Sequence, residues 1–595
     1  MRPLLAVVYF AKESETERNL FDFARALGVE AQLVCVGPSG LTGELLIHKI
    51  QHATAIVISA STLCAVETSG VVSLSPFEPT RGSTKNILVY GLQPDNAHES
   101  LVARLTGGAV RAISALPKGA RSSFRRDGGS LLGPLAGCDF ERDPGLRDAG
   151  FELGEETGVQ RIMDVGHVPV FIRLKRASNG FFLWANGDTI PGPRNQFAEA
   201  DLARRCDRFV PVLVFLRSSF RGHCWENPVK TARVIIDDPL LKERYGFIDY
   251  EEMLHSMRRL SCGITTAFIP WNWRRTSRRD AQLFAPFLPD HSICVHGCDH
   301  TRNEFGEGSE HDLAAKASVA LERMDIHRDR TDLGSSRVMV FPQGKFSSAA
   351  MRALRRAGFL AAVNSTRVPT DDPGATVPLV QELQPAITCY SGLPLFKRRY
   401  PADLEACSLD LFLGRPAHIV EHHSWFRQGC GDFERCVEWL KAIQPGLSWP
   451  SLEVGLPQQQ WRRISTNGEM EIRFFTSQFS FESPLEDVAS FAFSKPEPDA
   501  NLVESVTVDG RPIAYDLDEG MMRFCVQLRP KRPIAIAVNV AHHDGTVRWS
   551  PPLKYRVRVG LRRALSEMRD NHLAKHPAAF RAAETVIRAF RGRPR

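Results

Sequence analysis

Several short apolar runs of this chain end abruptly in residues that can bind a metal or move a proton. Carboxyl ends of parallel strands meet at one face of an α/β barrel, where active sites are built. We therefore expect these endings to converge on a single pocket. They are Val234–Ile236 before Asp237 and Asp238, Ile293–Val295 before His296 and His300, Val338–Phe341 before Pro342-Gln343-Gly344, and Ala417–Val420 before Glu421, His422 and His423.

The residue types at these endings predict metal-assisted acyl hydrolysis. One carboxylate and two imidazoles are a common ligand set for catalytic Zn²⁺, or another divalent metal, with one position left for water. A metal at such a site acidifies its water toward neutral pH and so generates a nucleophile. A second carboxylate next door could accept the proton of that water, and a further histidine could protonate the departing group. Backbone N–H groups of a Pro-Gln-Gly turn could stabilise the oxyanion.

The order of these motifs resembles the polysaccharide deacetylase (NodB homology) family, carbohydrate esterase family four, over about residues 230–430. The resembling features are an Asp-Asp pair, a His-x-x-x-His pair, a Pro-x-Gly turn and a late histidine. The resemblance implies a (β/α) barrel that removes acyl groups from carbohydrates with the help of a divalent metal. It implies the following roles: Asp237 as base, Asp238, His296 and His300 as metal ligands, the Gln343 amide at the oxyanion, and His422 or His423 as general acid.

Two motifs depart from the family pattern. The first reads Ile-Asp-Asp-Pro, where the family usually has Phe-Asp-Asp-Gly. In the third, Val340 stands where many members carry an arginine that orients the base. The doubled histidine leaves the acid open, and strand alternation favours His422 slightly over His423.

The alternation of apolar runs predicts an α/β multidomain protein. Strands that alternate with helical patterns indicate parallel sheets covered by helices, whereas short period-2 runs between Gly, Pro and Asp turns are typical of an antiparallel sandwich. The expected parts are a doubly wound α/β domain (1–165), a hairpin linker (166–200), a deacetylase-like (β/α) barrel (201–450), an antiparallel β-sandwich (451–552) and a basic helical tail (553–595).

Composition narrows the class of protein. The 595 residues are 43% hydrophobic and 24% charged, which is ordinary for a globular chain with more than one core. The sequence has no apolar run of about 18 residues and no secretory signal pattern. Its thirteen scattered cysteines include no Cys-x-x-Cys pair, which suits a reducing compartment. We expect a cytoplasmic protein.

The positive charge gathers at the C-terminus. From Lys554 onward there are twelve Lys and Arg residues against three Asp and Glu residues. One interpretation is a solvated helix face. The other is contact with an anionic membrane surface or an acidic partner, because residues 578–595 form an amphipathic pattern. Nucleic acid is not expected as a partner, since basic and aromatic residues do not interleave on a larger face.

These observations favour a metal-dependent N-deacetylase of an acylated amino sugar, carried by a nucleotide-linked, lipid-linked or oligosaccharide substrate. The missing arginine motivates an alternative, a catalytically impaired carbohydrate-binding or scaffold protein built on a deacetylase barrel. A metal hydrolase for a non-sugar amide is a third hypothesis. The sequence predicts neither the sugar nor the oligomeric state.

Overall fold

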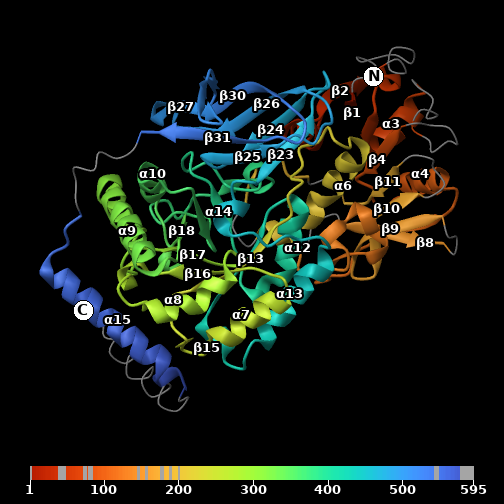
Figure 1. Ribbon diagram of the computed structural model, residues 1–595. Helices are drawn as coiled ribbons and strands as arrows, with labels where there is room; N and C mark the ends of the chain where they lie inside the picture. Colours follow the sequence, from red (N-terminus) through yellow and green to blue (C-terminus); the bar gives the residue numbers. More distant parts are fainter. Residues whose placement is uncertain are drawn as a thin grey trace.

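The computed structural model describes residues 3–37, 49–70, 77, 85–143, 148–154, 158–174, 180–186, 190–197, 201–541 and 549–575. The chain is mixed α/β. Figure 1 shows an N-terminal sheet and a β-sandwich on one side of a central barrel, and helix α15 on the barrel's other side.

The N-terminal part is a mixed sheet with the strand order β2-β1-β3-β4-β11-β10-β9-β6-β7. The pairs among β1 to β4 and between β4 and β11 are parallel, whereas β11-β10, β10-β9, β9-β6 and β6-β7 are antiparallel. The strands are β1 (Leu4–Phe10), β2 (Glu30–Val36), β3 (Ala55–Ser59), β4 (Asn86–Tyr90), β6 (Ser122–Phe124), β7 (Asp139–Phe140), β9 (Val159–Val165), β10 (Val168–Leu174) and β11 (Phe181–Trp184), with helices α1 (Glu15–Ala26), α3 (Ala60–Ser69) and α4 (Asn96–Thr106). A separate antiparallel pair joins β5 (Val110–Ala115) to β8 (Ala149–Leu153).

The two strands expected to form a hairpin at 166–200 do pair antiparallel, as β10 and β11, and this pair is part of the N-terminal sheet. Strand β11 pairs in parallel with β4 and antiparallel with β10, so it lies inside the sheet. All four of its residues, Phe181–Trp184, are buried. A strand that is apolar on both faces is typical of such an internal position. The Ser-Asn-Gly turn expected between the two strands lies outside the described residues.

The central part is a nearly closed sheet of parallel strands surrounded by helices. Within residues 201–541, which are described without a gap, seven strands follow the order β21-β19-β18-β17-β16-β13-β22. Arg399 bridges in parallel to Ile419 and so nearly closes the barrel between β21 and β22. The strands are β13 (Ala232–Asp237), β16 (Ile264–Phe268), β17 (His291–His296), β18 (Ser336–Val340), β19 (Ala361–Asn364), β21 (Leu395–Lys397) and β22 (Ala417–His422), and the main helices are α7 (Tyr250–Arg259), α8 (Arg278–Phe284), α9 (Glu310–Thr331), α10 (Ser348–Arg356), α12 (Leu404–Leu413) and α13 (Gly431–Ile443).

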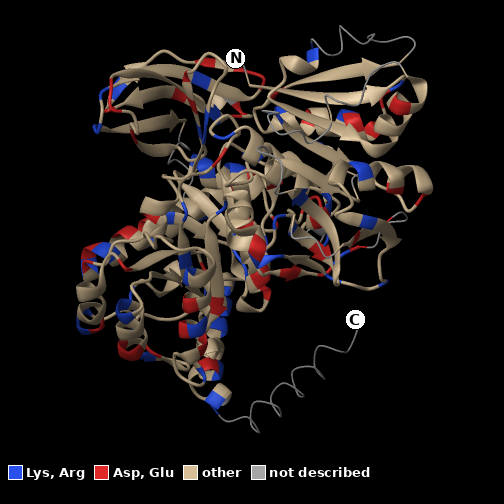
Figure 2. Ribbon diagram, turned by 90° about the vertical axis from the view of Figure 1, so that its right-hand side faces the viewer, with Lys and Arg blue, Asp and Glu red and all other residues tan. Residues whose placement is uncertain are grey.

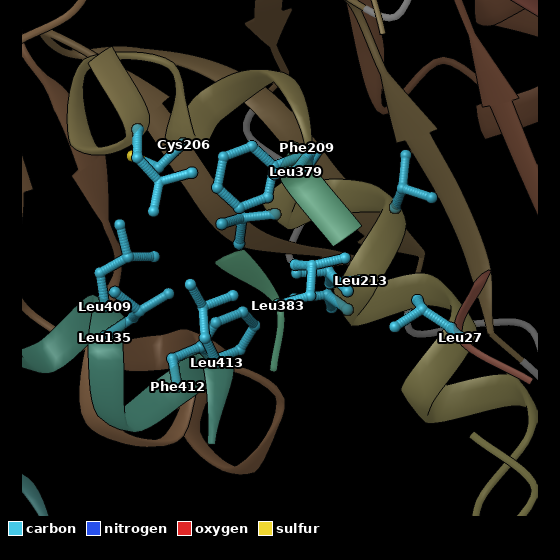
Figure 3. Close-up of a cluster of buried hydrophobic side chains, with 14 of the residues drawn as sticks. Leu27, Leu135, Cys206, Phe209, Leu213, Leu379, Leu383, Leu409, Phe412 and Leu413 are labelled. Carbon is cyan, nitrogen blue, oxygen red and sulfur yellow. The ribbon is translucent and has the colours of Figure 1, made fainter. Parts of the chain in front are cut away.

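An apolar cluster joins the barrel to the N-terminal part. Helix α6 (Val210–Ser219) runs between them, and all residues from Val210 to Leu216 are buried. Figure 3 shows side chains of α6, of the short helix α11 (Leu379–Glu382) and of α12 pointing toward one another. Strands β12 (Gln196–Phe197) and β20 (Val377–Pro378) form a small antiparallel pair, and β20 directly precedes α11 in the sequence. The barrel and the N-terminal sheet therefore share one continuous core.

Residues 460–540 form two facing sheets. Their common core is rich in phenylalanine, and the burial of β25 alternates residue by residue, as its period-2 pattern predicts. The pair β24-β26 is parallel, and the other pairs are antiparallel. One sheet holds β23 (Gln460–Ile464), β24 (Met470–Phe474), β26 (Ala489–Pro496), β30 (Met521–Leu528) and β29 (Asp516–Asp518); the other holds β25 (Gln478–Glu482), β31 (Pro533–Val540), β27 (Val503–Val508) and β28 (Arg511–Ile513).

The described part of the basic tail is helix α15 (Leu553–Asn571), followed by the short η12 (Leu573–Lys575). The amphipathic segment 578–595, on which the expected membrane contact rested, lies outside the described residues. Among the residues that are described, no helix is both long enough and apolar enough to cross a bilayer. In Figure 2, basic and acidic residues are interspersed over the elements in view.

Candidate metal centre and active site

Asp238, His296 and His300 lie together at the carboxyl ends of β13 and β17. Asp238 Oδ1 is 3.0 Å from His300 Nε2 and 3.3 Å from His296 Nε2. One ligand atom of each residue lies within 4.8 Å of the other two. Ligands of a tetrahedral zinc at about 2.0–2.1 Å are separated from each other by roughly 3.3 Å. The three residues therefore have the spacing that a small divalent cation needs.

The Asp238 carboxylate has the properties of a metal ligand. Its Oδ1 is buried and accepts no hydrogen bond of good geometry from the described residues. A buried polar atom without a partner is rare, because leaving it unsatisfied costs free energy. Burial raises the pKa of Asp238, but the imidazoles of His300 and His296 outweigh burial and hold that pKa well below its usual range. The carboxylate is thus held in its ionised form, which is the form that binds a cation.

A backbone carbonyl orients His296 for metal binding. Its Nδ1 lies 3.0 Å from the Val340 oxygen at the end of β18. Because a carbonyl can only accept, Nδ1 carries the hydrogen and Nε2 presents its lone pair toward Asp238. This hydrogen bond to the second ring nitrogen is the usual way in which proteins fix a ligating histidine.

Glu304 shapes the loop that carries His300. Its carboxylate accepts hydrogen bonds from the backbone N–H groups of Cys298, Asp299 and His300 at 3.0, 2.8 and 3.0 Å. His300 has a φ of 56°, in the left-handed region that non-glycine residues avoid. No sequence motif pointed to Glu304, although it follows His300 by only four residues.

Three of the predicted site residues have a strained backbone. Asp238 and Gln343 also have positive φ values, 80° and 59°. Each such residue costs of order 1–3 kcal/mol, and strain of this kind clusters at functional sites. The strain at Asp238, His300 and Gln343 is therefore consistent with a site whose geometry is held by its surroundings.

Asp237 is paired with an arginine that the motifs did not reveal. Arg398 Nη1 and Nη2 donate to the two carboxylate oxygens of Asp237, each at 2.8 Å, and both side chains are buried. Burial raises the pKa of Asp237. The charge and hydrogen bonds of Arg398, together with the nearby His296 and His422, lower it by more, so the pKa lies below its usual value. Arg398 thus orients Asp237, although Val340 occupies the position at which the family pattern has an arginine.

Arg398 also follows a strand end, and this position is the signal by which the sequence could have indicated it. The apolar run Leu393–Phe396 leads into Lys397-Arg398-Arg399, in the same way as the other runs lead into acidic residues and histidines. No spacing rule connects it with Asp237, because 161 residues separate the two. The pairing becomes visible only when β21 takes its place in the barrel.

The two late histidines lie in different surroundings. His422 is in register with Asp237 between the parallel strands β22 and β13, so both side chains project from the same face of the sheet. His423 is buried against the loop after β13, where its ring stacks on Phe247 with the ring centroids 5.7 Å apart. Its Nε2 lies 3.4 Å from Asp570 of α15. Of the pair, only His422 shares the face of Asp237.

The Gln343 turn is in contact with the histidine loop. Gln343 lies in η8 (Pro342–Gly344), directly after β18 and Phe341. A Cβ at Gly297 would approach Pro342 Cγ to 2.5 Å, so the loop after His296 packs closely against this turn. Glycine is needed at 297 also because its φ is 65°. The turn expected to bind the oxyanion therefore lies beside a predicted metal ligand.

Helix α15 lies across the loops that surround the three predicted ligands. The loop after β13, which includes β14 (Arg244–Tyr245) and β15 (Ile248–Asp249), contacts it through Tyr245, whose hydroxyl donates to Asp570 at 2.9 Å. The loop after β16 contributes an ion pair of Arg275 with Glu567. Sequence patterns did not predict this contact, because the paired residues are about 300 positions apart.

One contact of α15, between Arg563 and His300, is incompatible with metal binding by His300. Arg563 Nη2 lies 3.3 Å from His300 Nδ1. A guanidinium can only donate, so this contact makes Nδ1 the acceptor and leaves the hydrogen on Nε2. A metal at Nε2 requires the opposite tautomer. Metal binding by His300 and this contact of Arg563 therefore exclude each other, and Arg563 must shift when a metal binds.

The comparisons with known proteins give distant likenesses. No protein-family model and no curated protein matches the chain. Among solved structures, the novel carbohydrate deacetylase Agd3 is similar over 90% of this chain and 98% of its own, with 10% identity and a TM-score of 0.45. The chain is similar to carbohydrate deacetylases.

Two smaller proteins are similar to part of the chain. A family 4 carbohydrate esterase from Streptomyces lividans, solved in complex with acetate, covers 37% of this chain and 91% of its own at 13% identity and a TM-score of 0.23. A CE4 esterase from Streptococcus mutans covers 38% and 87% at 13% identity and a TM-score of 0.24.

Proposed function

We propose that this protein is a metal-dependent hydrolase that removes the acyl group from an N-acylated amino sugar. The observation that carries the proposal is the meeting of Asp238, His296 and His300 within 3.0 and 3.3 Å at one end of the barrel. Next to them, a buried carboxylate is held by a bidentate arginine. A ligand set beside an oriented base is what hydrolysis of an amide by activated water requires.

The chain's own residues divide the reaction among them. When bound, a divalent metal such as zinc acidifies water and polarises the acyl carbonyl. Asp237 accepts a proton from the attacking water, and Arg398 keeps its carboxylate ionised and oriented. The Gln343 N–H donates to the oxygen that becomes negative. His422 gives a proton to the sugar nitrogen as the carbon–nitrogen bond breaks, which releases the free amine and a carboxylate such as acetate.

The main reason for the alternative, a catalytically impaired carbohydrate-binding or scaffold protein, no longer holds. It rested on the absent arginine, and Arg398 supplies a guanidinium to Asp237 from another strand end. This chemistry is compatible with an amino sugar in a nucleotide-linked, a lipid-linked or an oligosaccharide substrate. The cytoplasmic location and the membrane contact of the C-terminal tail stay predictions.

Acetate release with and without metal tests the proposal. We expect the zinc-loaded protein to release acetate from N-acetylglucosamine oligosaccharides, a chelator to abolish the release, and added Zn²⁺ to restore it. Enzymatic detection of acetate and mass spectrometry of the deacetylated sugar measure the reaction. Binding of the oligosaccharide without any acetate release would support the scaffold instead, and acetate release that survives full removal of metal would refute the metal's role.

A further inference from the structure

Helix α15 has an inverted amphipathic arrangement. A helix on the surface of a globular protein normally turns its apolar stripe toward the core and its charged residues toward water. In α15 the buried side chains are Val559, Arg563 and Asp570. The side of the helix that contacts the protein is thus mainly polar.

The inward contacts are hydrogen bonds and ion pairs. Tyr555 donates to Asp299 at 3.0 Å, and Asn571 accepts from the Gly246 N–H at 2.7 Å. The ion pair of Glu567 and the hydrogen bond of Asp570 lie on the same side. These contacts hold α15 in place, so its outward side is fixed as well.

The outward side is an apolar ridge. Five large apolar side chains project from it at intervals of four, four, four and three residues, which places them along one face of the helix. Singly exposed apolar residues are ordinary, but a contiguous row of this kind marks an interaction site. The outer ridge of α15 consists of Leu553, Val557, Leu561, Leu565 and Met568, which are 73%, 63%, 61%, 52% and 49% exposed.

The charges around the outer ridge are of one sign. Within the described residues 549–575, all the exposed charged side chains are Lys or Arg, and none is Asp or Glu. Glu567 and Asp570 are turned inward into their pairs with Arg275 and Tyr245. The exposed cations are Lys554, Arg556, Arg558 and Lys575, together with Arg569, which also pairs with Asp570 at 2.6 Å. An apolar face with flanking lysines and arginines is the pattern of a helix that lies in the interface of an anionic membrane.

We propose that the outer ridge of α15 docks on the surface of an anionic lipid bilayer. The ridge enters the boundary between headgroups and acyl chains, while the flanking cations contact the anionic headgroups. A protein partner would have to supply both an apolar groove and a row of acidic groups, whereas an anionic bilayer offers both features everywhere on its surface. This inference uses residues of the described helix and is independent of the reaction at the barrel.

Docking through the ridge would fix the orientation of the molecule. Because the inner side of α15 contacts the loops that carry His300 and Tyr245, the predicted metal centre would lie one helix diameter, about 10–12 Å, from the lipid. The barrel mouth would then face the bilayer.

Vesicle flotation with the full-length protein tests the docking. We expect binding to vesicles of two parts phosphatidylcholine to one part phosphatidylglycerol, weak binding to pure phosphatidylcholine, and loss of binding as salt is added. The double substitution Val557→Asp and Leu561→Asp should weaken binding by at least about tenfold, since it places charge where apolar surface is buried. Neutralising Lys554, Arg556 and Arg558 by alanine should weaken it independently.

A matched control separates the ridge from apolar exposure in general. Val488, in the β-sandwich, is 64% exposed, almost the same as Val557, so Val488→Asp should leave vesicle binding unchanged. The Val557→Asp/Leu561→Asp variant and Val488→Asp should both keep the wild-type unfolding temperature and the acetate release from a soluble substrate. A failure of docking is thereby distinguished from a failure of the proposed chemistry. No binding to anionic vesicles, or an equal loss with Val488→Asp, would overturn the proposal. So would a dimer in light scattering that Val557→Asp dissociates, because the ridge would then join two copies of the chain.

Discussion

Replacing Asp238 by alanine is expected to abolish both metal binding and acetate release. Asp238 is the one anionic ligand of the predicted set, and its Oδ1 lies 3.0 and 3.3 Å from the two imidazoles. Loss of a residue that only supports a ligand costs about 10–100-fold in metal affinity. Loss of the ligand itself should therefore cost at least about a hundredfold. Zinc per chain after dialysis, measured by mass spectrometry, and acetate release from an oligosaccharide report the two effects.

Asp312 provides the control for this substitution. Its side chain is 71% exposed on α9 and belongs to no metal-binding cluster found among the described residues. Asp312→Ala should keep the zinc content and turnover of the wild-type protein. Loss of turnover by Asp238→Ala at full zinc occupancy would contradict the assignment of Asp238 as a ligand.

Replacing Asp237 by asparagine is expected to keep the metal and to lower turnover by about 10²–10⁴-fold. Asparagine has nearly the same shape but cannot accept the proton of the attacking water, and general base catalysis contributes a factor of that size. The change also leaves the buried Arg398 charge without a carboxylate, so the free energy of unfolding should fall, by up to about 3–5 kcal/mol. Zinc content, kcat and chemical denaturation are measured on the same preparation.

A second buried carboxylate separates the effect of lower stability on turnover from the effect of removing the general base. Asp410 pairs with Arg399 and Arg415 and is buried, but it lies on α12 and away from the predicted ligands. Asp410→Asn should lower the free energy of unfolding in a similar way and retain turnover below the unfolding transition. Wild-type turnover in Asp237→Asn would rule out the role of Asp237 as base.

The barrel and its ligand set follow from local features of the sequence. Each strand is a short apolar run, and each run ends in the residues that the C-terminal face of a barrel displays. These features are local and do not depend on long-range contacts, and the structure does bring Asp238, His296 and His300 together. The resemblance to a family added roles for these positions, but it placed the arginine that orients the base at position 340, where this chain has valine.

Contacts between distant segments were not predictable in this way. Arg398 reaches Asp237 across 161 positions, and Arg563 reaches His300 across 263. Neither pair leaves a periodic signal, because each depends on how complete elements pack. The strand pair at 166–200 was predicted, but its place in the N-terminal sheet was not, because a strand of four buried residues can pair in several sheets and only the packed fold selects its place beside β4. Charge counts similarly described the tail as basic but could not show that the polar side of α15 faces the barrel.

The proposed reaction requires a single cation held by Asp238, His296 and His300. Anomalous scattering at the zinc edge, from crystals grown with Zn²⁺, tests this directly. We predict one peak about 2.0–2.2 Å from Asp238 Oδ1 and from the Nε2 atoms of both histidines, with Arg563 displaced from its 3.3 Å contact with His300. Density for these side chains with no peak between them, or a peak held by other residues, would contradict the account.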